Sequence, residues 1–226
     1  MTRRVVVALL VAVALVLLPA GCGGGSSPKT EGGWHDGTVA LVGDSMAFEA
    51  AADFERLAGE RGWTLSITAV PGTTFADRRA DIAALHARFA SAVVVELGTN
   101  DALHDGDFTA AEAADIDRAV TALDRVGCVL FVNAGLLEPR NHDVLRQPPW
   151  DDYAPGLEAA LALNAHLVAA VRPHRNMHVF DWFAAYNARA DWTRDFVHLK
   201  AEHRAGYARL VLDALSDACG PGTTAS

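Results

Sequence analysis

The chain has 226 residues, a formal net charge of −9 and 51% hydrophobic residues. A chain of this length can bury the core of one domain without support from metals or disulfides. Nucleic-acid-binding proteins carry clustered Lys and Arg; this acidic sequence has no basic patch, which argues against nucleic acid as a partner.

The first 21 residues have the pattern of an export signal. Arg3 and Arg4 form a positive segment, Val5 to Leu18 form an apolar segment, and small residues follow up to Gly21. The apolar run is shorter than the ~20 residues that a membrane-spanning helix needs. Residues 1–21 are therefore predicted to be a signal peptide, and its removal changes the net charge from −9 to −11 because two arginines leave with it.

Cys22 follows directly, in the run Leu18-Pro19-Ala20-Gly21-Cys22. This run resembles the lipobox of bacterial lipoproteins, with Pro19 where Leu is usual. The resemblance implies that Cys22 is lipidated, so that the protein is exported, faces outward and touches the membrane only through this anchor. Plain secretion and a retained N-terminal anchor are the alternatives. Residues 22–37, rich in Gly and Ser, are predicted to form a flexible tether.

Apolar, β-branched runs alternate with segments of helical periodicity along the rest of the chain. The predicted strands are Thr38–Val42, Thr64–Val70, Ala92–Leu97, Cys128–Asn133 and Met177–Asp181. The predicted helices are Phe48–Ala58, Asp77–Phe89, Thr109–Leu123, Pro155–Val171 and Ala201–Ala218, with a long loop over Gly135–Ala154. This alternation predicts an α/β fold with three layers, α/β/α, around a doubly wound, flavodoxin-like sheet of about five parallel strands. The domain is expected to span residues 38–219, followed by a disordered tail, residues 220–226.

Cys128 and Cys219 lie within the predicted domain. An exported chain meets an oxidising compartment, where a pair of cysteines can form a disulfide; two buried thiols are the alternative. Cys128 begins a predicted strand and Cys219 follows the last helix, so both are expected at the edge of the sheet away from the carboxyl ends of the strands. A disulfide there would be structural.

Gly43-Asp44-Ser45 follows the first predicted strand and precedes a helix. Ligands of such folds bind beyond the carboxyl ends of the strands, so the Ser45 hydroxyl is expected there, beside the N–H groups of the helix start. The alternative is an ordinary turn with a helix-capping residue. The tripeptide alone does not decide between the two.

Asn100, in Gly98-Thr99-Asn100-Asp101, follows the third strand at the same predicted edge. Its side-chain amide can donate a hydrogen bond to an oxyanion, although an Asn in such a loop also serves as a helix cap. Gly72 follows the second strand; its backbone allows close approach and can offer an N–H, although a plain turn glycine has the same signature.

Asp195 and His198 lie between the last strand and the last helix. Their three-residue spacing lets one turn hold the carboxylate against one ring nitrogen and leaves the other nitrogen for Ser45. A surface Asp beside an unrelated His is the alternative. The rival acids and the rival base are Asp181, Asp191, Glu202 and His203.

Taken together and in this chain order, the motifs resemble those of the SGNH hydrolase family, also called GDSL esterases and lipases, over nearly the whole predicted domain. The resemblance implies that Ser45 is the nucleophile, His198 the base and Asp195 the residue that orients it. The N–H groups of Ser45 and Gly72 and the side chain of Asn100 would form the oxyanion hole.

One position departs from the family pattern. The family usually places a glycine about five residues after the catalytic histidine, but His203 stands there and Gly206-Tyr207 follow three positions later. The change is expected to alter the start of the last helix by about one turn.

The resemblance and the site residues predict a serine esterase without a metal or other cofactor. The expected substrate is a small acyl ester, such as an acetyl ester, of an envelope or extracellular carbohydrate or lipid. An O-acyltransferase with the same residues and a non-catalytic, tethered binding lipoprotein are the alternatives. The loop after the fourth strand carries side chains suited to contact a sugar, or to form a proline-rich cover: Arg140, His142, Arg146, Trp150 and Tyr153.

Overall fold

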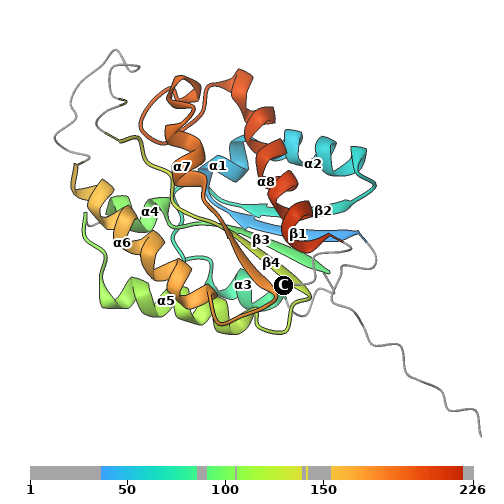
Figure 1. Ribbon diagram of the computed structural model, residues 1–226, viewed down its shortest axis with the longest axis horizontal. Helices are drawn as coiled ribbons and strands as arrows, with labels where there is room; N and C mark the ends of the chain where they lie inside the picture. The colour runs from blue at the N-terminus through green and yellow to red at the C-terminus, as the bar shows by residue number, and fades with distance from the viewer. Residues whose placement is uncertain (1–36, 86–90, 105, 139–140, 142–153, 221–226) are drawn as a thin grey trace, which may run out of the picture. The chain divides into compact units, whose positions relative to one another are not determined.

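The computed structural model of the chain describes residues 37–85, 91–104, 106–138, 141 and 154–220 (Figure 1). The predicted signal peptide, Cys22 and nearly all of the predicted tether lie outside these residues, as do the tail from residue 221 and most of the loop after the fourth strand. Among the helices that are described, none combines the length and the apolarity needed to cross a membrane.

Five parallel strands form one sheet in the order β2-β1-β3-β4-β5 (Figure 1). They are β1 (Thr38–Gly43), β2 (Thr64–Ala69), β3 (Ala92–Glu96), β4 (Cys128–Val132) and β5 (Met177–Phe180). Every residue of β3 and β4 is buried, which explains their continuous apolar runs. The order reverses between β1 and β3, as in flavodoxin-like sheets, and this confirms the predicted fold class.

Helices cover both faces of the sheet (Figure 1). One face carries α3 (Arg79–Leu85), α4 (Thr99–His104), α5 (Ala110–Ala122) and α6 (Ala154–Val171); the other carries α1 (Ser45–Glu49), α2 (Ala51–Glu60), α7 (Trp182–Asn187) and α8 (Arg204–Cys219). Side chains of β1 alternate between the two cores, with Val42 in the first and Leu41 in the second. The three predicted layers are present.

Some helices differ from the prediction. The helix that follows the first strand is divided at Ala50 (φ −96°, ψ 5°) into α1 and α2. The helices α4 and α7 have six residues each, which is too few to show a helical period in the sequence. A capping box begins α5: the Glu112 N–H donates to the Thr109 hydroxyl, and the Thr109 N–H donates to the Glu112 carboxylate.

The last helix begins later than the sequence pattern indicated. A 3-10 turn, Ala201–His203, precedes α8, so α8 begins at Arg204 and not at the predicted Ala201. A Cβ on Gly206 would lie 2.6 Å from the Trp192 ring, and this glycine therefore lets the ring pack against α8. The His203 ring stacks on the same Trp192, with 5.0 Å between ring centroids.

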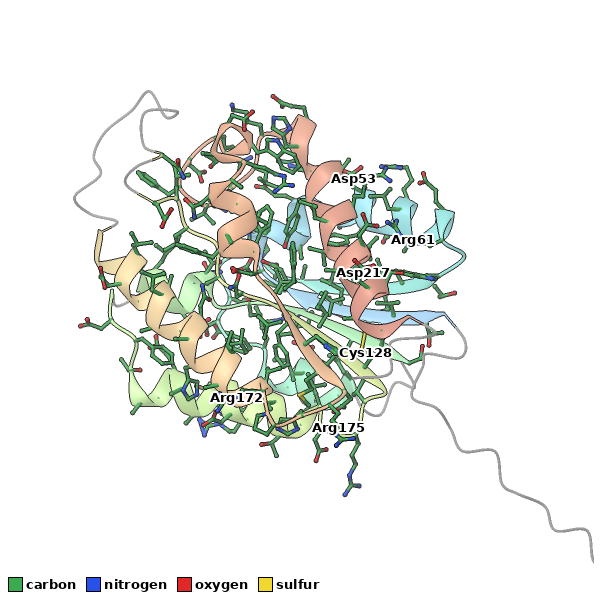
Figure 2. The ribbon with its side chains drawn as sticks, viewed as in Figure 1. Asp53, Arg61, Cys128, Arg172, Arg175 and Asp217 are labelled. Carbon is green, nitrogen blue, oxygen red and sulfur yellow. A yellow bond between two sulfur atoms is a disulfide. The ribbon has the colours of Figure 1, made fainter. Side chains whose placement is uncertain are left out.

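Cys128 and Cys219 form a disulfide in the structure, with their Cα atoms 5.9 Å apart. The bond connects the start of β4 to the end of α8, at the amino end of the sheet (Figure 2). It closes a loop of 91 residues. Ser45 and Asn100 follow the carboxyl ends of β1 and β3, so the disulfide lies at the opposite edge from them.

Candidate active site

Ser45 begins α1 directly after β1, because Gly43 and Asp44 turn the chain there. A Cβ on Gly43 would lie 2.9 Å from a carboxylate oxygen of Glu96, so only glycine fits this position. Asp44 then caps the helix by accepting a hydrogen bond from the Met46 N–H (3.0 Å). The two residues before Ser45 thus place its side chain at the carboxyl end of the sheet.

Asp195 and His198 lie in a short antiparallel turn closed by a bridge between Thr193 and Leu199. Asp195 Oδ1 accepts hydrogen bonds from the N–H groups of Val197 (2.8 Å) and His198 (2.6 Å). These two hydrogen bonds close the turn around the carboxylate of Asp195. They explain the three-residue spacing between the acid and the imidazole.

The turn brings the imidazole of His198 between Ser45 and Asp195. His198 Nε2 lies 3.0 Å from Ser45 Oγ, and His198 Nδ1 lies 3.0 Å from Asp195 Oδ2. The serine and the histidine are 153 residues apart in the chain, so only the tertiary fold could join them. The structure thus assembles the three residues to which the sequence analysis assigned catalytic roles.

The hydrogen bond between Asp195 and His198 changes the pKa of both side chains. Partial burial would raise the pKa of Asp195, but the hydrogen bonds that it accepts from the His198 ring and from two backbone N–H groups outweigh burial and hold the pKa at about 2. The hydrogen bond with Asp195 in turn raises the pKa of His198. Asp195 is therefore an anion at neutral pH, and it stabilises a positively charged imidazole.

The rival residues lie elsewhere. Asp181 caps α7, where its Oδ1 accepts a hydrogen bond from the Ala184 N–H (3.1 Å). Asp191 and Glu202 have exposed side chains in two separate 3-10 turns. His203 stacks on Trp192 and makes no hydrogen bond to Ser45 within the described part of the chain.

Asn100 and the loop of Gly72 lie at the same edge of the sheet. Asn100 Nδ2 donates to Asp44 Oδ2 (2.9 Å) and to the backbone carbonyl of Thr73 (3.1 Å). Gly72 is exposed and has a φ of 75°, a conformation that favours glycine. Asn100 therefore connects the residue before Ser45 to the loop that carries the predicted second backbone donor.

Three further acids at this edge are buried, and no sequence motif marked them as a group. Asp44, Glu96 and Asp101 are 0%, 3% and 2% exposed. Burial raises the pKa of Asp44 to about 6, that of Asp101 to about 7, and that of Glu96 well above its usual value. A signal was available: Glu96 is a lone acid at the end of an apolar strand, Ala-Val-Val-Val-Glu.

Glu49, at the end of α1, is a further residue that the sequence analysis missed. Its carboxylate accepts hydrogen bonds from Arg194 (2.6 Å) and Arg204 (2.8 Å). Arg194 precedes Asp195 in the turn, and Arg204 begins α8. The ion pair with Arg194 therefore attaches the helix of Ser45 to the turn that carries Asp195 and His198, and the ion pair with Arg204 attaches it to α8.

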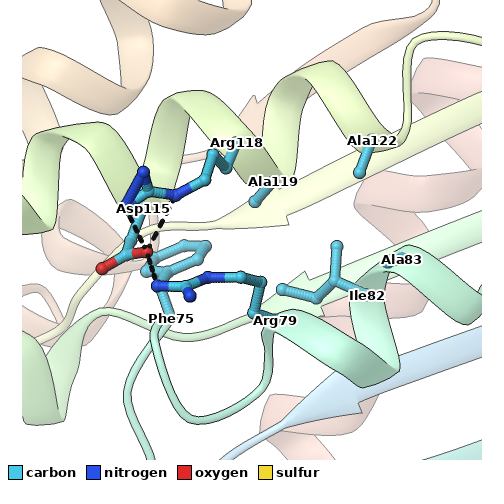
Figure 3. Close-up of a pocket in the computed structure, with 8 residues that line it drawn as sticks. All are labelled: Phe75, Arg79, Ile82, Ala83, Asp115, Arg118, Ala119 and Ala122. Atoms are coloured by element: carbon cyan, nitrogen blue, oxygen red, sulfur yellow. Dashed lines mark hydrogen bonds and ion pairs between the residues drawn. The ribbon is translucent and has the colours of Figure 1, made fainter.

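A separate cavity of about 210 Å³ lies between α3 and α5 (Figure 3). Arg79 and Arg118 converge there on the carboxylate of Asp115, at 2.5 and 2.9 Å. Neither Ser45 nor His198 lines this cavity, so it is distinct from the candidate active site. The lining residues are Phe75, Arg79, Ile82, Ala83, Asp115, Arg118, Ala119 and Ala122.

A serine, a histidine and an aspartate joined at the carboxyl end of a doubly wound sheet form the arrangement that serine hydrolases use for acyl transfer. The sequence profile of the GDSL-like Lipase/Acylhydrolase family matches residues 18–208. The chain belongs to this family and is a serine ester hydrolase.

Solved structures of other enzymes share the fold. A GDSL-like lipase from Bacteroides thetaiotaomicron is 16% identical, with a TM-score of 0.63, and the match covers 81% of this chain and 89% of that one. The psychrotrophic esterase EstA from Pseudoalteromonas sp. is 14% identical (TM-score 0.61; 80% and 98% covered). The acetylxylan esterase Axe2 from Geobacillus stearothermophilus is 14% identical (TM-score 0.59; 84% and 96% covered). A search of the curated proteins found no match to this chain.

Proposed function

We propose that the protein hydrolyses short-chain acyl esters, such as acetyl esters, with Ser45 as nucleophile, His198 as general base and Asp195 as the residue that orients the base. The observation that carries this proposal is the position of the His198 ring, with one nitrogen 3.0 Å from Ser45 Oγ and the other 3.0 Å from the Asp195 carboxylate. This geometry suits proton transfer from the serine.

The reaction has two halves. Ser45 Oγ attacks the ester carbonyl while His198 Nε2 takes its proton, and the histidine then returns that proton to the leaving alcohol oxygen as the C–O bond breaks. A water molecule repeats the sequence on the acyl-enzyme: it gives a proton to His198 and attacks the carbonyl, and Ser45 leaves with the proton. Asp195 remains ionised throughout, since its pKa is about 2.

The oxyanion is assigned to three donors: the N–H groups of Ser45 and Gly72 and the side-chain amide of Asn100. Ser45 lies in the first turn of α1, where backbone N–H groups lack helical partners. Both amide hydrogens of Asn100 are engaged, by Asp44 and by the Thr73 carbonyl. The oxyanion is therefore expected to take the place of the Thr73 carbonyl as the acceptor of one Asn100 amide hydrogen.

An acylated carbohydrate or lipid of the cell envelope or the extracellular space is the proposed substrate. The export signal predicted over residues 1–21 and the lipid anchor predicted at Cys22 support this location. The shared fold of the Axe2 acetylxylan esterase supports an acetyl ester of a glycan among the possible esters. Cys22→Ser in the full-length protein, compared with the wild type by membrane fractionation and labelling with a fatty-acid analogue, tests the anchor.

Replacement of the serine tests the chemistry directly. Ser45→Ala is expected to lower kcat on p-nitrophenyl acetate by a factor on the order of 10⁴ to 10⁶, because no nucleophile remains. A fluorophosphonate probe should label the wild type at Ser45 and leave the variant unlabelled. Ser216→Ala, an exposed serine of α8, is the matched control and should retain full activity. Undiminished turnover by Ser45→Ala would overturn the proposal.

Product analysis identifies the acceptor. With acetylated glycans and an excess of free sugar, hydrolysis predicts free acetate, whereas transfer predicts acetylated sugar. A panel of p-nitrophenyl esters of increasing chain length then gives the acyl preference, which we expect to be highest for the shortest chains.

A further inference from the structure

Asp44 and Glu96 form a pair of buried carboxyl groups directly beneath the start of α1. Gly43 and Glu96 are register partners on neighbouring strands, which places the two acids side by side. Glu96 Oε2 accepts hydrogen bonds from the N–H groups of Asp44 and Ala47, both at 3.2 Å. Asp44 Oδ1 accepts from the Met46 N–H. Both acids therefore bind the backbone that carries Ser45.

Both acids of this pair are buried. Within the described residues, neither Asp44 nor Glu96 forms an ion pair with Lys or Arg. Adjacent carboxyl groups in such a site cannot both be ionised, so they share a proton. Burial, the Asp44 charge and a hydrogen bond between the two side chains raise the pKa of Glu96, whereas the same hydrogen bond lowers that of Asp44. Glu96 therefore holds the proton.

The groups around the pair agree with this assignment. His198 faces Asp44 from the active-site turn and lowers the pKa of Asp44, so it favours the anion there. Tyr207, on α8, is fully buried and lies beside Glu96. Burial raises the pKa of Tyr207 well above its usual value, so it stays neutral. Asp101 lies close enough for the Asp44 charge to contribute to its raised pKa.

The pair also determines the direction of the Asn100 amide. The Asn100 amide donates two hydrogen bonds. The one to Asp44 Oδ2 is the shorter, at 2.9 Å, and the one to the Thr73 carbonyl is 3.1 Å. An ionised carboxylate accepts more strongly than a neutral acid. A chain of hydrogen bonds therefore runs from Glu96 through Asp44 to Asn100, one of the assigned oxyanion donors.

We propose that Glu96 is a positioning residue of the active site: its carboxylic acid donates to Asp44 and thereby holds the Asp44 carboxylate against the amide of Asn100. Glu96 is only 3% exposed, so it acts through its neighbours and not on the substrate. The proposal rests on the proposed function, since the direction of Asn100 matters only if that amide stabilises an oxyanion.

Two substitutions of Glu96 should behave in opposite ways. In Glu96→Gln, an amide N–H replaces the acidic O–H toward Asp44 and the amide oxygen still accepts from the backbone, so kcat should stay within about threefold of the wild type. Glu96→Leu removes both the donor to Asp44 and the acceptor for the backbone N–H groups. It should lower kcat by about 100-fold with little change in KM, the size of effect that loss of an oxyanion donor produces. A 100-fold loss in Glu96→Gln would show that the ionised acid is required and would overturn the proposal.

A double-mutant cycle separates positioning from general support of the fold. If Glu96 acts through Asn100, then Glu96→Leu combined with Asn100→Ala should be no slower than Asn100→Ala alone. Losses that multiply would mean that Glu96 does not act through Asn100. If thermal unfolding shows that Glu96→Leu is not folded, Glu96→Asp takes its place, since its shorter acid cannot reach both the backbone donors and Asp44.

The controls distinguish this proposal from the proposed function. Asp115→Asn, a buried acid of α5 next to the separate cavity, should leave kcat unchanged. An esterase activity is attributed to this site only if Ser45→Ala abolishes it. If Ser45→Ala is active, the proposed function fails; if it is inactive and the cycle is multiplicative, only the role of Glu96 fails.

Discussion

The two ends of the sheet are built in different ways. At the amino end, neutral groups and a covalent bond hold the strands: Ser91 Oγ donates to the Thr38 carbonyl (2.8 Å), and the disulfide joins Cys128 to Cys219. At the carboxyl end, Asp44, Glu96 and Asp101 are buried with raised pKa values. The first end contributes stability, while the second keeps unfavourable buried charge next to Ser45.

This difference indicates where function requires a loss of stability. A buried acid without a cation destabilises a fold, because its charged form loses hydration. Such groups persist here in hydrogen bonds that direct the start of α1, the Asn100 amide and the loop before α3. Substitutions at the carboxyl end should therefore change activity or raise stability, whereas those at the amino end should only lower stability.

The largest effect is expected for Asp195→Asn. Without the carboxylate, the His198 ring loses the partner that fixes its tautomer, and kcat should fall by about 10³- to 10⁴-fold. The substitution also removes the main cause of the raised pKa of His198, so the acidic limb of the remaining activity should shift to lower pH. Kinetics on p-nitrophenyl acetate as a function of pH measure both. Asp191→Asn, in the neighbouring 3-10 turn, is the control and should behave as the wild type.

Removal of the disulfide should cause the next largest effect, on stability alone. Cys128→Ala with Cys219→Ala opens a loop of 91 residues, and the free energy of unfolding should fall by about 4 kcal/mol. Urea unfolding measures this change. A reductant should destabilise the wild type and leave the double variant unaffected, while kcat of the folded variant stays unchanged. A large loss of kcat in the folded variant would contradict the separation of the two ends.

Asp101→Asn should stabilise the fold in a pH-dependent manner. Burial raises the pKa of Asp101 from 3.8 to about 7, so between these values the folded protein binds more protons than the unfolded one and stability falls as pH rises. The amide lacks this penalty. The free energy of unfolding of the variant should match that of the wild type below pH 4 and exceed it by about 2 kcal/mol at pH 8. This gain is smaller than the raised pKa of Asp101 alone would give, because the amide accepts the Phe75 N–H more weakly than the carboxylate does.

Urea unfolding at several pH values tests that prediction. Asp107→Asn, an exposed acid between α4 and α5, should show no such pH-dependent difference. A variant of Asp101 that is destabilised equally at pH 4 and pH 8 would mean that burial of its charge is not what limits stability at this end.

The smallest effect is expected for Thr109→Ala, at the start of α5. The substitution removes the capping hydrogen bond to the Glu112 N–H and should lower the free energy of unfolding by about 1 kcal/mol without a change in kcat. Thr121→Ala, an exposed threonine of the same helix, controls for the loss of a hydroxyl. A change in kcat would show that α5 is coupled to the site.

Much of the fold was predictable because burial leaves a pattern in the sequence. The strands β1, β3 and β4 are buried on both faces and appear as continuous apolar runs, so their positions agree with the prediction within one residue at either end. The short helices α4 and α7 were not predicted, since six residues cannot show a helical period. The division at Ala50 also has no signature in the sequence.

The candidate site was predictable in its reacting groups but not in its supporting groups. Ser45, Asn100 and His198 lie in motifs that resemble those of the SGNH family, and the turn around Asp195 follows from local spacing. Glu49 and Glu96 acquire their roles only from long-range contacts, with Arg194 in the first case and with the backbone of Asp44 in the second. Nothing in the neighbouring sequence distinguishes Glu49 from an ordinary surface acid.

The sequence by itself determined the class of fold and the edge of the sheet at which Ser45 and Asn100 lie, because periodicity, capping and turn formation are local effects. Only the tertiary structure decided which acid faces His198, which histidine reaches Ser45, and how the buried pair Asp44–Glu96 is connected to Asn100. Those choices depend on distances between segments up to 153 residues apart, and on the loss of water around charges that pack together only in the folded chain.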